Sequence, residues 1–420
     1  MKQQKVKWRK LDNASKVFPA TCNNRDTKVF RLACELNDLV EPEVLQHALE
    51  LTLENFPLYR SVLRRGVFWY YFESSDIKPL VEMENQPLCA PIYIKDRRNL
   101  QFRVSYYHKR INLEVFHALT DGAGVIWFME SLIYYYMINR YKNLSNEIPK
   151  INYKASISQK MADSFAKNFS KSNPPKKSNK KRIATAHRVK GTRMPENRMN
   201  LIEGAMSVKK ILELAHKYDT TLTIFTSSLL LYSIFKDMDS NSINKPVVLS
   251  VPINLRQYFE SYTARNFFST MNIDYDFKNK SPELEDIIKY VGESFKNGLS
   301  KEELDYHLYR LMAFETNPLA RVIPLTLKDL TLKFVNKYTD RGITSSISNI
   351  GRINMPPEFT PYIHQFTICV SARRPQVTMC SYNDRLVISF ITPFEETDIQ
   401  RTFFQFLANN GVDVEITSNL

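Results

Sequence analysis

The stretch EVFHALTDGAG, residues 114–124, joins a strand-like apolar run to a helix-like one. The residues before it predict a β-hairpin over 101–117, and those after it predict a helix over about 123–141. Histidine can both take and return a proton near neutral pH, so His117 at the strand end is a candidate general base. Asp121 stands just before the helix, where a carboxylate accepts backbone N–H groups or pairs with an arginine.

Taken singly, these residues have ordinary structural interpretations. A histidine at a strand end is commonly just polar, an aspartate before a helix is commonly an N-cap, and Gly122 lets the chain turn tightly. The complete HxxxDG pattern, however, is expected by chance in only about one of a hundred chains of this composition. Its place at a predicted strand–helix junction therefore favours a catalytic site at His117, Asp121 and Gly122.

Both halves of the chain show helix and strand patterns. In the first half we expect strands at 28–36 and 67–73 and a helix at 41–57. In the second half the expected helices lie within 207–236, 282–314, 325–338 and 397–409. The expected strands there are 245–253, 266–275, 342–350, 366–372, 377–382 and 385–391. This indicates an α/β (α+β) chain of two similar lobes, each a mixed sheet flanked by helices, and not a βαβ alternation.

The length of 420 residues suggests two or three domains at roughly 150 residues each. We expect an N-terminal lobe over 1–164 that carries HxxxDG, a basic flexible linker over 165–193, and a C-terminal lobe over 194–420. The linker holds ten basic residues and no acidic one. Its composition indicates a solvated tether.

The linker also accounts for most of the net charge. The whole chain carries 58 − 44 = +14, so the residues outside the linker carry only 14 − 10 = +4. This weakens a nucleic-acid interpretation, and aromatic residues are not interleaved with the basic run. The alternative to a plain tether is a loop that contacts phosphate groups, with four candidate residues: Lys176, Lys177, Lys180 and Lys181.

Several site classes lack sequence support. The chain has no GxxxxGK[ST], HExxH or GxSxG motif, and Trp127 interrupts a possible GxGxxG. The five cysteines show no CxxC spacing, so neither a disulfide framework nor a metal site is expected. The charged N-terminus MKQQKVKWRK lacks a signal-like apolar run, and no stretch approaches the roughly 18 apolar residues of a membrane span. We therefore expect a cytoplasmic protein without a transmembrane segment.

FHALTDG resembles the HxxxDG signature of the chloramphenicol acetyltransferase-like superfamily of acyltransferases and condensation domains. Four other stretches resemble bacterial alcohol O-acetyltransferase-like members: WRKLDNASKVFP (8–19), VPINLRQYF (251–259), NFFST (266–270) and SNIGRINMP (348–356). The resemblance spans essentially the whole chain. It implies two chloramphenicol acetyltransferase-like lobes with an active-site tunnel between them.

The resemblance also implies residue roles. His117 matches the general base, and Asp121 matches a structural aspartate that is usually salt-bridged to an arginine. Arg256 is the best candidate for that arginine, and Arg265 is a weaker one.

Two further residues take part in the resemblance, and the sequence departs from the family's patterns at two points. Ser348 and Asn349 fall where the second lobe lines the tunnel, as candidate oxyanion donors; their other interpretation is a polar strand end. Position 116 is Phe, where many condensation domains have a second histidine, and the DFGWG motif of plant enzymes is absent.

The resemblance implies an acyltransferase that moves an acyl group, expected to be acetyl, from a coenzyme A thioester to a hydroxyl or amine. Coenzyme A is then a co-substrate and not a permanently bound cofactor, and a monomer without nucleic-acid partners is expected. Two alternatives stay open. The donor could be an acyl carrier protein, as for condensation domains, or the chain could be a non-catalytic basic binding protein on the same fold.

Overall fold

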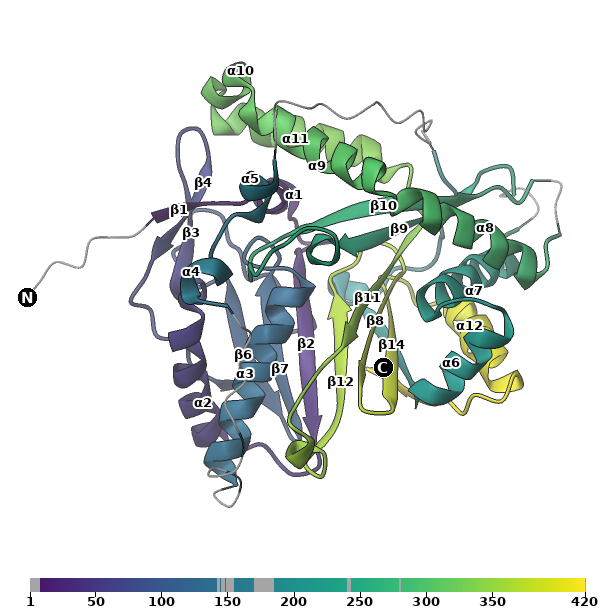
Figure 1. The fold of residues 1–420 in the computed structure, drawn as a ribbon, viewed down its shortest axis with the longest axis horizontal. Helices are drawn as coiled ribbons and strands as arrows, with labels where there is room; N and C mark the ends of the chain where they lie inside the picture. The colour runs from purple at the N-terminus through teal and green to yellow at the C-terminus, as the bar shows by residue number, and fades with distance from the viewer. Residues whose placement is uncertain are drawn as a thin grey trace, which may run out of the picture.

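The computed structural model describes residues 8–141, 144, 148, 155–169, 185–239, 243–278 and 281–419. They form a mixed α/β structure with two lobes side by side (Figure 1). Within these residues, no helix is long and apolar enough to span a membrane.

The N-terminal lobe is built on a five-stranded sheet. Its order is β12 (Ile363–Val370), β2 (Val29–Leu36), β7 (Arg110–Phe116), β6 (Phe102–Tyr107) and β5 (Glu82–Met83). All neighbours are antiparallel except β5 and β6. Two helices pack against this sheet: α2 (Pro42–Asn55) and α3 (Gly122–Arg140). A separate three-stranded sheet lies at its edge: β1 (Trp8–Lys10), β4 (Tyr70–Ser74) and β3 (Ser61–Arg65).

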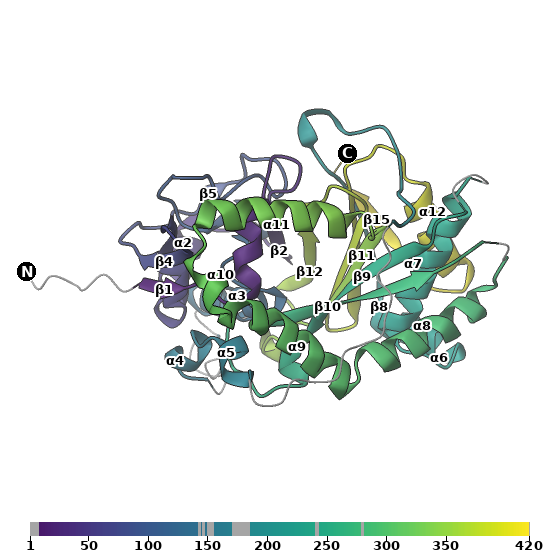
Figure 2. The same cartoon turned by 90° about the horizontal axis from the view of Figure 1, so that it is seen from above.

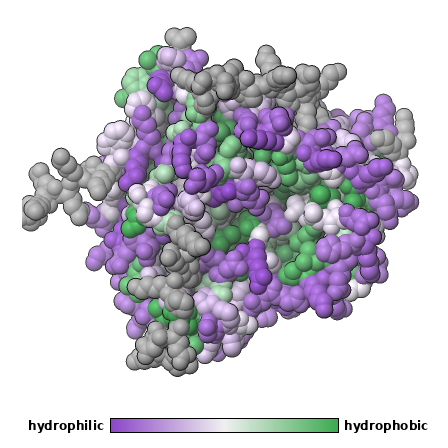
Figure 3. Space-filling view, viewed as in Figure 1, coloured by the Kyte–Doolittle hydropathy of each residue, from purple (hydrophilic) through white to green (hydrophobic). Residues whose placement is uncertain are grey.

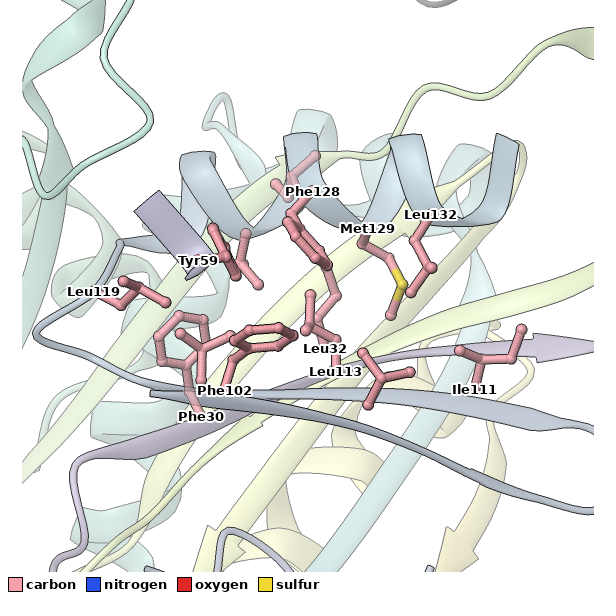
Figure 4. Close-up of a cluster of buried hydrophobic side chains, with 14 of the residues drawn as sticks. Phe30, Leu32, Tyr59, Phe102, Ile111, Leu113, Leu119, Phe128, Met129 and Leu132 are labelled. Carbon is pink, nitrogen blue, oxygen red and sulfur yellow. The ribbon is translucent and has the colours of Figure 1, made fainter. Parts of the chain in front are cut away.

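The core between α3 and the sheet fixes where the β7–α3 junction lies. Phe128, Met129 and Leu132 of α3 point toward strand residues that include Leu32 and Leu113 (Figure 4). All five side chains are buried. Burying a side chain of this size contributes about 1.5–3 kcal/mol. The start of α3 is therefore held firmly over the end of β7.

The C-terminal lobe is built on a seven-stranded sheet. Its order is β10 (Phe268–Tyr275), β9 (Val247–Asn254), β11 (Ser345–Arg352), β13 (Gln376–Tyr382), β14 (Arg385–Thr392), β8 (Asn200–Ser207) and β15 (Glu415–Ser418). Strand β11 is parallel to both neighbours, and the other pairs are antiparallel. Helices pack on the side away from the N-terminal lobe (Figure 1): α6 (Val208–Lys217), α7 (Leu222–Asp237), α8 (Leu284–Gly298) and α12 (Asp398–Asn409).

The lobes are joined through strand β12. This strand comes from the second half of the chain, pairs with β2 over its whole length, and also packs against β13. There, Cys380 Sγ donates to the carbonyl oxygen of Phe366 at 3.3 Å. The expected lobe boundaries at 164/165 and 193/194 stay a prediction, but the second half of the chain supplies a strand to the first lobe's sheet.

A run of helices also crosses between the lobes (Figure 2). They are α9 (Lys301–Thr316), α10 (Pro318–Val322) and α11 (Leu325–Asp340). Helix α11 packs on α1 (Val17–Thr21), and the backbone N–H of Leu325 donates to the carbonyl oxygen of Val67 at 2.8 Å. The surface in the view of Figure 1 is mostly hydrophilic, with hydrophobic patches in its central part (Figure 3).

Most of the expected elements are confirmed, including the hairpin over 101–117 and the helix over 41–57. The strand expected at 67–73 is wrong at its start. The backbone N–H of Gly66 donates to the carbonyl oxygen of Trp69 at 3.0 Å, so this segment forms a turn, and β4 begins at Tyr70. The apolar side chains of Val67, Phe68 and Trp69 suggested a buried strand, but the turn leaves them exposed.

Candidate active site

The imidazole of His117 lies in an aromatic surrounding supplied by both lobes. Its ring stacks on Phe18 with centroids 4.3 Å apart, and it makes tilted contacts with Phe30 at 4.9 Å and Phe268 at 5.5 Å. Phe18 and Phe30 belong to the first lobe, whereas Phe268 begins β10 of the second. The backbone N–H of His117 donates to the carbonyl oxygen of Lys28 at 2.8 Å, which anchors the strand end. The side chain remains partly exposed.

Asn266 fixes the tautomer of His117. The Asn266 Nδ2 group donates to Ser15 Oγ and to the carbonyl oxygen of His117, both at 2.9 Å. The amide oxygen is thereby left facing His117 Nδ1 at 3.2 Å. Because that oxygen can only accept, Nδ1 carries the proton and Nε2 keeps its lone pair.

The surroundings keep the ring neutral. Burial lowers the pKa of His117, because the aromatic neighbours exclude the water that would solvate an imidazolium. The hydrogen bond to Asn266 acts in the opposite direction and is smaller. A neutral ring with Nε2 unprotonated is the form that can accept a proton.

The Asp121 carboxylate ties the junction to the second lobe. Its Oδ1 accepts from the Gly124 N–H at 3.1 Å, which caps α3. Its Oδ2 accepts from Arg256 Nη1 at 2.8 Å and from the Phe267 N–H at 2.7 Å. The two charged side chains of this pair are only 5% and 8% exposed. Such a buried, fully bonded pair fixes geometry.

Arg256 is itself held by backbone oxygens. Its Nε donates to the carbonyl of Thr263 at 3.0 Å and its Nη2 to that of Arg265 at 2.5 Å. Arg265, the other candidate for the pair with Asp121, instead lies 3.5 Å from Asp12. The ion pair with Asp121 is therefore made by Arg256.

This chain matches neither a protein-family model nor a curated protein sequence. Solved structures do match it along nearly their whole length. Polyketide synthase associated protein 5 from Mycobacterium tuberculosis has a TM-score of 0.63 at 13% identity, covering 96% of this chain and 97% of that one. The trichothecene 15-O-acetyltransferase TRI3 of Fusarium sporotrichioides has 0.63 at 10% identity, covering 96% and 94%. TRI101 of F. sporotrichioides, solved with coenzyme A and T-2, has 0.62 at 9% identity, covering 97% and 99%.

The chain has the chloramphenicol acetyltransferase-like fold. The starter condensation domain of rhizomide synthetase and the first condensation domain of the CDA synthetase match it as well. At these identities the likeness establishes the fold, including the expected two lobes of mixed α/β structure.

Two glycines at the start of α3 allow close approach within this chloramphenicol acetyltransferase-like fold. A Cβ on Gly122 would lie 3.2 Å from Ile350 Cγ2, so β11 of the second lobe reaches the helix start here. A Cβ on Gly124 would lie 2.0 Å from Thr120 Oγ1 and 2.1 Å from the carbonyl oxygen of Ala264. Gly124 was not predicted as a functional position, although the GAG sequence contains it.

Strand β11 carries the two expected tunnel residues. Ser348 is partly buried and lies opposite Thr378 of β13. Asn349 is exposed, and its Nδ2 donates to Thr223 Oγ1 at 3.1 Å. The Asn349 amide thus faces the start of α7 in this structure.

The remaining points concern the four linker lysines, possible metal ligands, and Asn266. Lys176, Lys177, Lys180 and Lys181 fall outside the described residues. No group of three or more possible metal ligands exists in the part of the chain that the structure describes. The sequence pattern did not indicate Asn266 as the partner of His117, although the NFFST stretch begins with it.

Proposed function

We propose that this protein is an acyltransferase that moves an acyl group, expected to be acetyl, from a coenzyme A thioester to a hydroxyl or amine acceptor. The observation that carries this proposal is the position of His117 at the meeting of the lobes, with its Nδ1 3.2 Å from the amide oxygen of Asn266. Among the described residues, none hydrogen-bonds to Nε2. The acyltransferases and condensation domains that share the fold support the same reaction class.

The proposed reaction uses His117 twice. Its Nε2 takes the proton of the acceptor hydroxyl or amine as the acceptor oxygen or nitrogen attacks the thioester carbonyl. The resulting tetrahedral oxyanion collapses and breaks the C–S bond. The imidazolium then returns the proton to the departing thiolate, so coenzyme A leaves as the thiol. Because the thioester is already activated, no oxidant or metal enters the balance.

In this proposal, Asp121 and Arg256 act as positioning residues. Their ion pair links the start of α3 to the segment after β9, which also carries Asn266 in the same loop. Ser348 and Asn349 stay candidates for stabilising the oxyanion. A well-placed donor contributes about 3 kcal/mol to such an intermediate. Ser348→Ala and Asn349→Ala should be made separately. The variant that removes a side chain donating to the oxyanion should have a lower kcat.

Screening for thiol release tests the proposal. Purified protein is mixed with acetyl-CoA and longer acyl-CoAs, and with a panel of alcohols and amines, while free thiol is followed and acylated product is identified by mass. Acceptor-dependent thiol release with a matching acylated product is expected. No release with any donor, together with salt-sensitive binding of nucleic acid or anionic lipid that survives His117→Ala, would favour the non-catalytic alternative.

A carrier-protein donor is the second candidate, because condensation domains share the fold. It is tested by comparing free acyl-CoA with the same acyl group on a carrier's phosphopantetheine arm. Equal turnover of the two donors would remove the case for carrier specificity. The cytoplasmic location and the monomeric state also stay predictions.

A further inference from the structure

A cavity of about 460 Å³ lies where the two lobes meet, and its lining includes Asn23 and Arg25, which precede β2 in the chain. Its walls come from the turn after α1, the C-terminal end of α11, the segment after β12, and residues 188–193. The last of these is the described end of the basic linker expected from the sequence. Among the residues that the structure describes, seven cationic side chains line it: Arg25, Arg188, Arg193, Lys337, Arg341, Arg373 and Arg374.

Acidic groups do not balance these cations. Asp340 is the one acidic residue among the described residues of the lining, and it contacts Arg374, Arg373 at 2.8 Å and Arg188 at 3.9 Å. Asp26, behind the wall, pairs with Lys28 at 2.6 Å and with Arg373 at 3.5 Å. The remaining cations of the lining form no salt bridge to any described residue.

Arg374, one of the lining residues, is affected by burial and by the neighbouring positive charge. Arg374 is partly buried, and its Nη1 donates to the carbonyl oxygens of Ile343 at 2.5 Å and Asp340 at 3.3 Å. Burial, and then repulsion from Arg188, lower the pKa of Arg374 to about 10. An anion in the cavity would stabilise the charged guanidinium and so counteract both effects. Guanidinium groups in such a cluster suit phosphate oxygens, because each can donate two parallel hydrogen bonds.

The cavity is connected to His117 through one short segment. Asn23 and Arg25 line the cavity, and Asn23 forms a backbone bridge with Asp26. Two residues on, the carbonyl oxygen of Lys28 accepts from the His117 N–H. The cavity therefore adjoins the segment that positions the proposed base.

We propose that this arginine cavity binds the phosphate groups of a substrate whose other end reaches His117. This rests on the proposed function, because it takes His117 as the reacting site. The ligand chemistry is a multiply charged phosphate group. Two sources fit it: the nucleotide half of the coenzyme A donor, and a phosphorylated acceptor.

Binding of two small probes tests the cavity without catalysis. The probes are inorganic pyrophosphate and adenosine 3′,5′-bisphosphate, measured by calorimetry on the full chain. The double variant Arg25→Gln/Arg341→Gln removes two lining charges that no described carboxylate pairs. It should weaken probe binding about tenfold or more, since hydrogen bonds between charged groups are the strong ones. The matched variant Arg401→Gln, on the exposed face of α12, should bind as the wild type does.

Unchanged binding in the double variant, or no binding of either probe to the wild type, would overturn the cavity proposal. His117→Ala should leave probe binding unchanged. The protein could instead bind the probes in an arginine-dependent way and still transfer no acyl group. That result would contradict the proposed function but would still support the phosphate site. The two proposals can therefore fail separately.

The Michaelis constants then separate the two sources. If the cavity holds the donor, the double variant raises KM for acetyl-CoA but not for the acetyl thioester of N-acetylcysteamine, which has no nucleotide. If it holds the acceptor, KM for both donors stays the same, and KM for a phosphorylated acceptor rises while that for its unphosphorylated form does not. A double variant that changes none of these constants would contradict the link to His117.

Discussion

At the residue scale, the account depends on a neutral His117 with a defined tautomer. Phe18 and the other rings around it lower its pKa by excluding water, and Asn266 holds the proton on Nδ1. The direction of the shift sets the sign of the pH dependence. A lowered pKa leaves the ring unprotonated down to a lower pH than an ordinary histidine, whose pKa is about 6.5. Activity should therefore be lost only as the pH falls below that ordinary value.

Exposing the His117 ring to water should shift the pH at which activity is lost. In Phe18→Ala the stacked ring is removed, burial is reduced, and the pKa of His117 rises toward its ordinary value. The acid limb of the kcat/KM profile should then shift to higher pH. The control is Phe68→Ala, at the exposed turn between β3 and β4. An acid limb that stays at the same pH in both variants would show that His117 is not the titrating group.

The Asp121–Arg256 pair should contribute strongly to stability. In Asp121→Asn one oxygen is replaced by an N–H₂ group, which cannot accept from Arg256 or Phe267 and leaves a buried guanidinium uncompensated. We expect the free energy of unfolding to fall by about 3–5 kcal/mol, measured by chemical denaturation. Asp398→Asn breaks an exposed pair with Arg401 and should cost less than about 1 kcal/mol. Equal losses in the two variants would contradict this role for Asp121.

At the element scale, the β7–α3 junction works because its glycines let two lobes approach the helix start. Gly124→Ala would drive a methyl group into Thr120 and into the backbone at Ala264, so we expect a loss of stability of at least about 1–3 kcal/mol and lower activity. Gly292→Ala on α8 meets no atom within 4 Å. There, alanine should stabilise by about 0.5–1 kcal/mol. Thermal unfolding of both variants checks the contrast, and a neutral Gly124→Ala would refute the close packing at this junction.

At the scale of the whole molecule, β12 makes the first lobe depend on the second half of the chain. Without β12, strand β2 would become an open edge whose residues are nearly all buried in the intact protein, and such edges aggregate. A fragment of residues 1–169 should therefore be insoluble when expressed alone. Co-expression with residues 185–420 should restore soluble, paired material, as judged by co-purification. A soluble, cooperatively folding fragment alone would show that β12 is dispensable.

The residue patterns predicted local features, whereas the distant pair Asp121–Arg256 was expected only from the family resemblance. The junction at 114–124 could be predicted because a strand pattern, a turn and a helix pattern follow one another directly. The pairing of β12 with β2 could not be predicted, because it joins residues more than 300 positions apart and leaves no periodic signal. For the same reason Asn266 was missed, since its role arises only where the second lobe meets His117. The cavity arginines are likewise scattered over residues 25–374 and converge only in the folded chain.

The most direct test of the central claim is the ratio of kcat/KM for acyl transfer between wild type and His117→Ala. It is measured as thiol release from acetyl-CoA with an acceptor that the screen identifies. The assay is run at about pH 7.5, where an ordinary histidine is mostly neutral. Unfolding curves and probe binding serve to show that the variant is folded. A positioned general base is worth about 10²–10⁴-fold, so the account predicts a loss in that range. A folded His117→Ala variant that transfers the acyl group as fast as the wild type would contradict it.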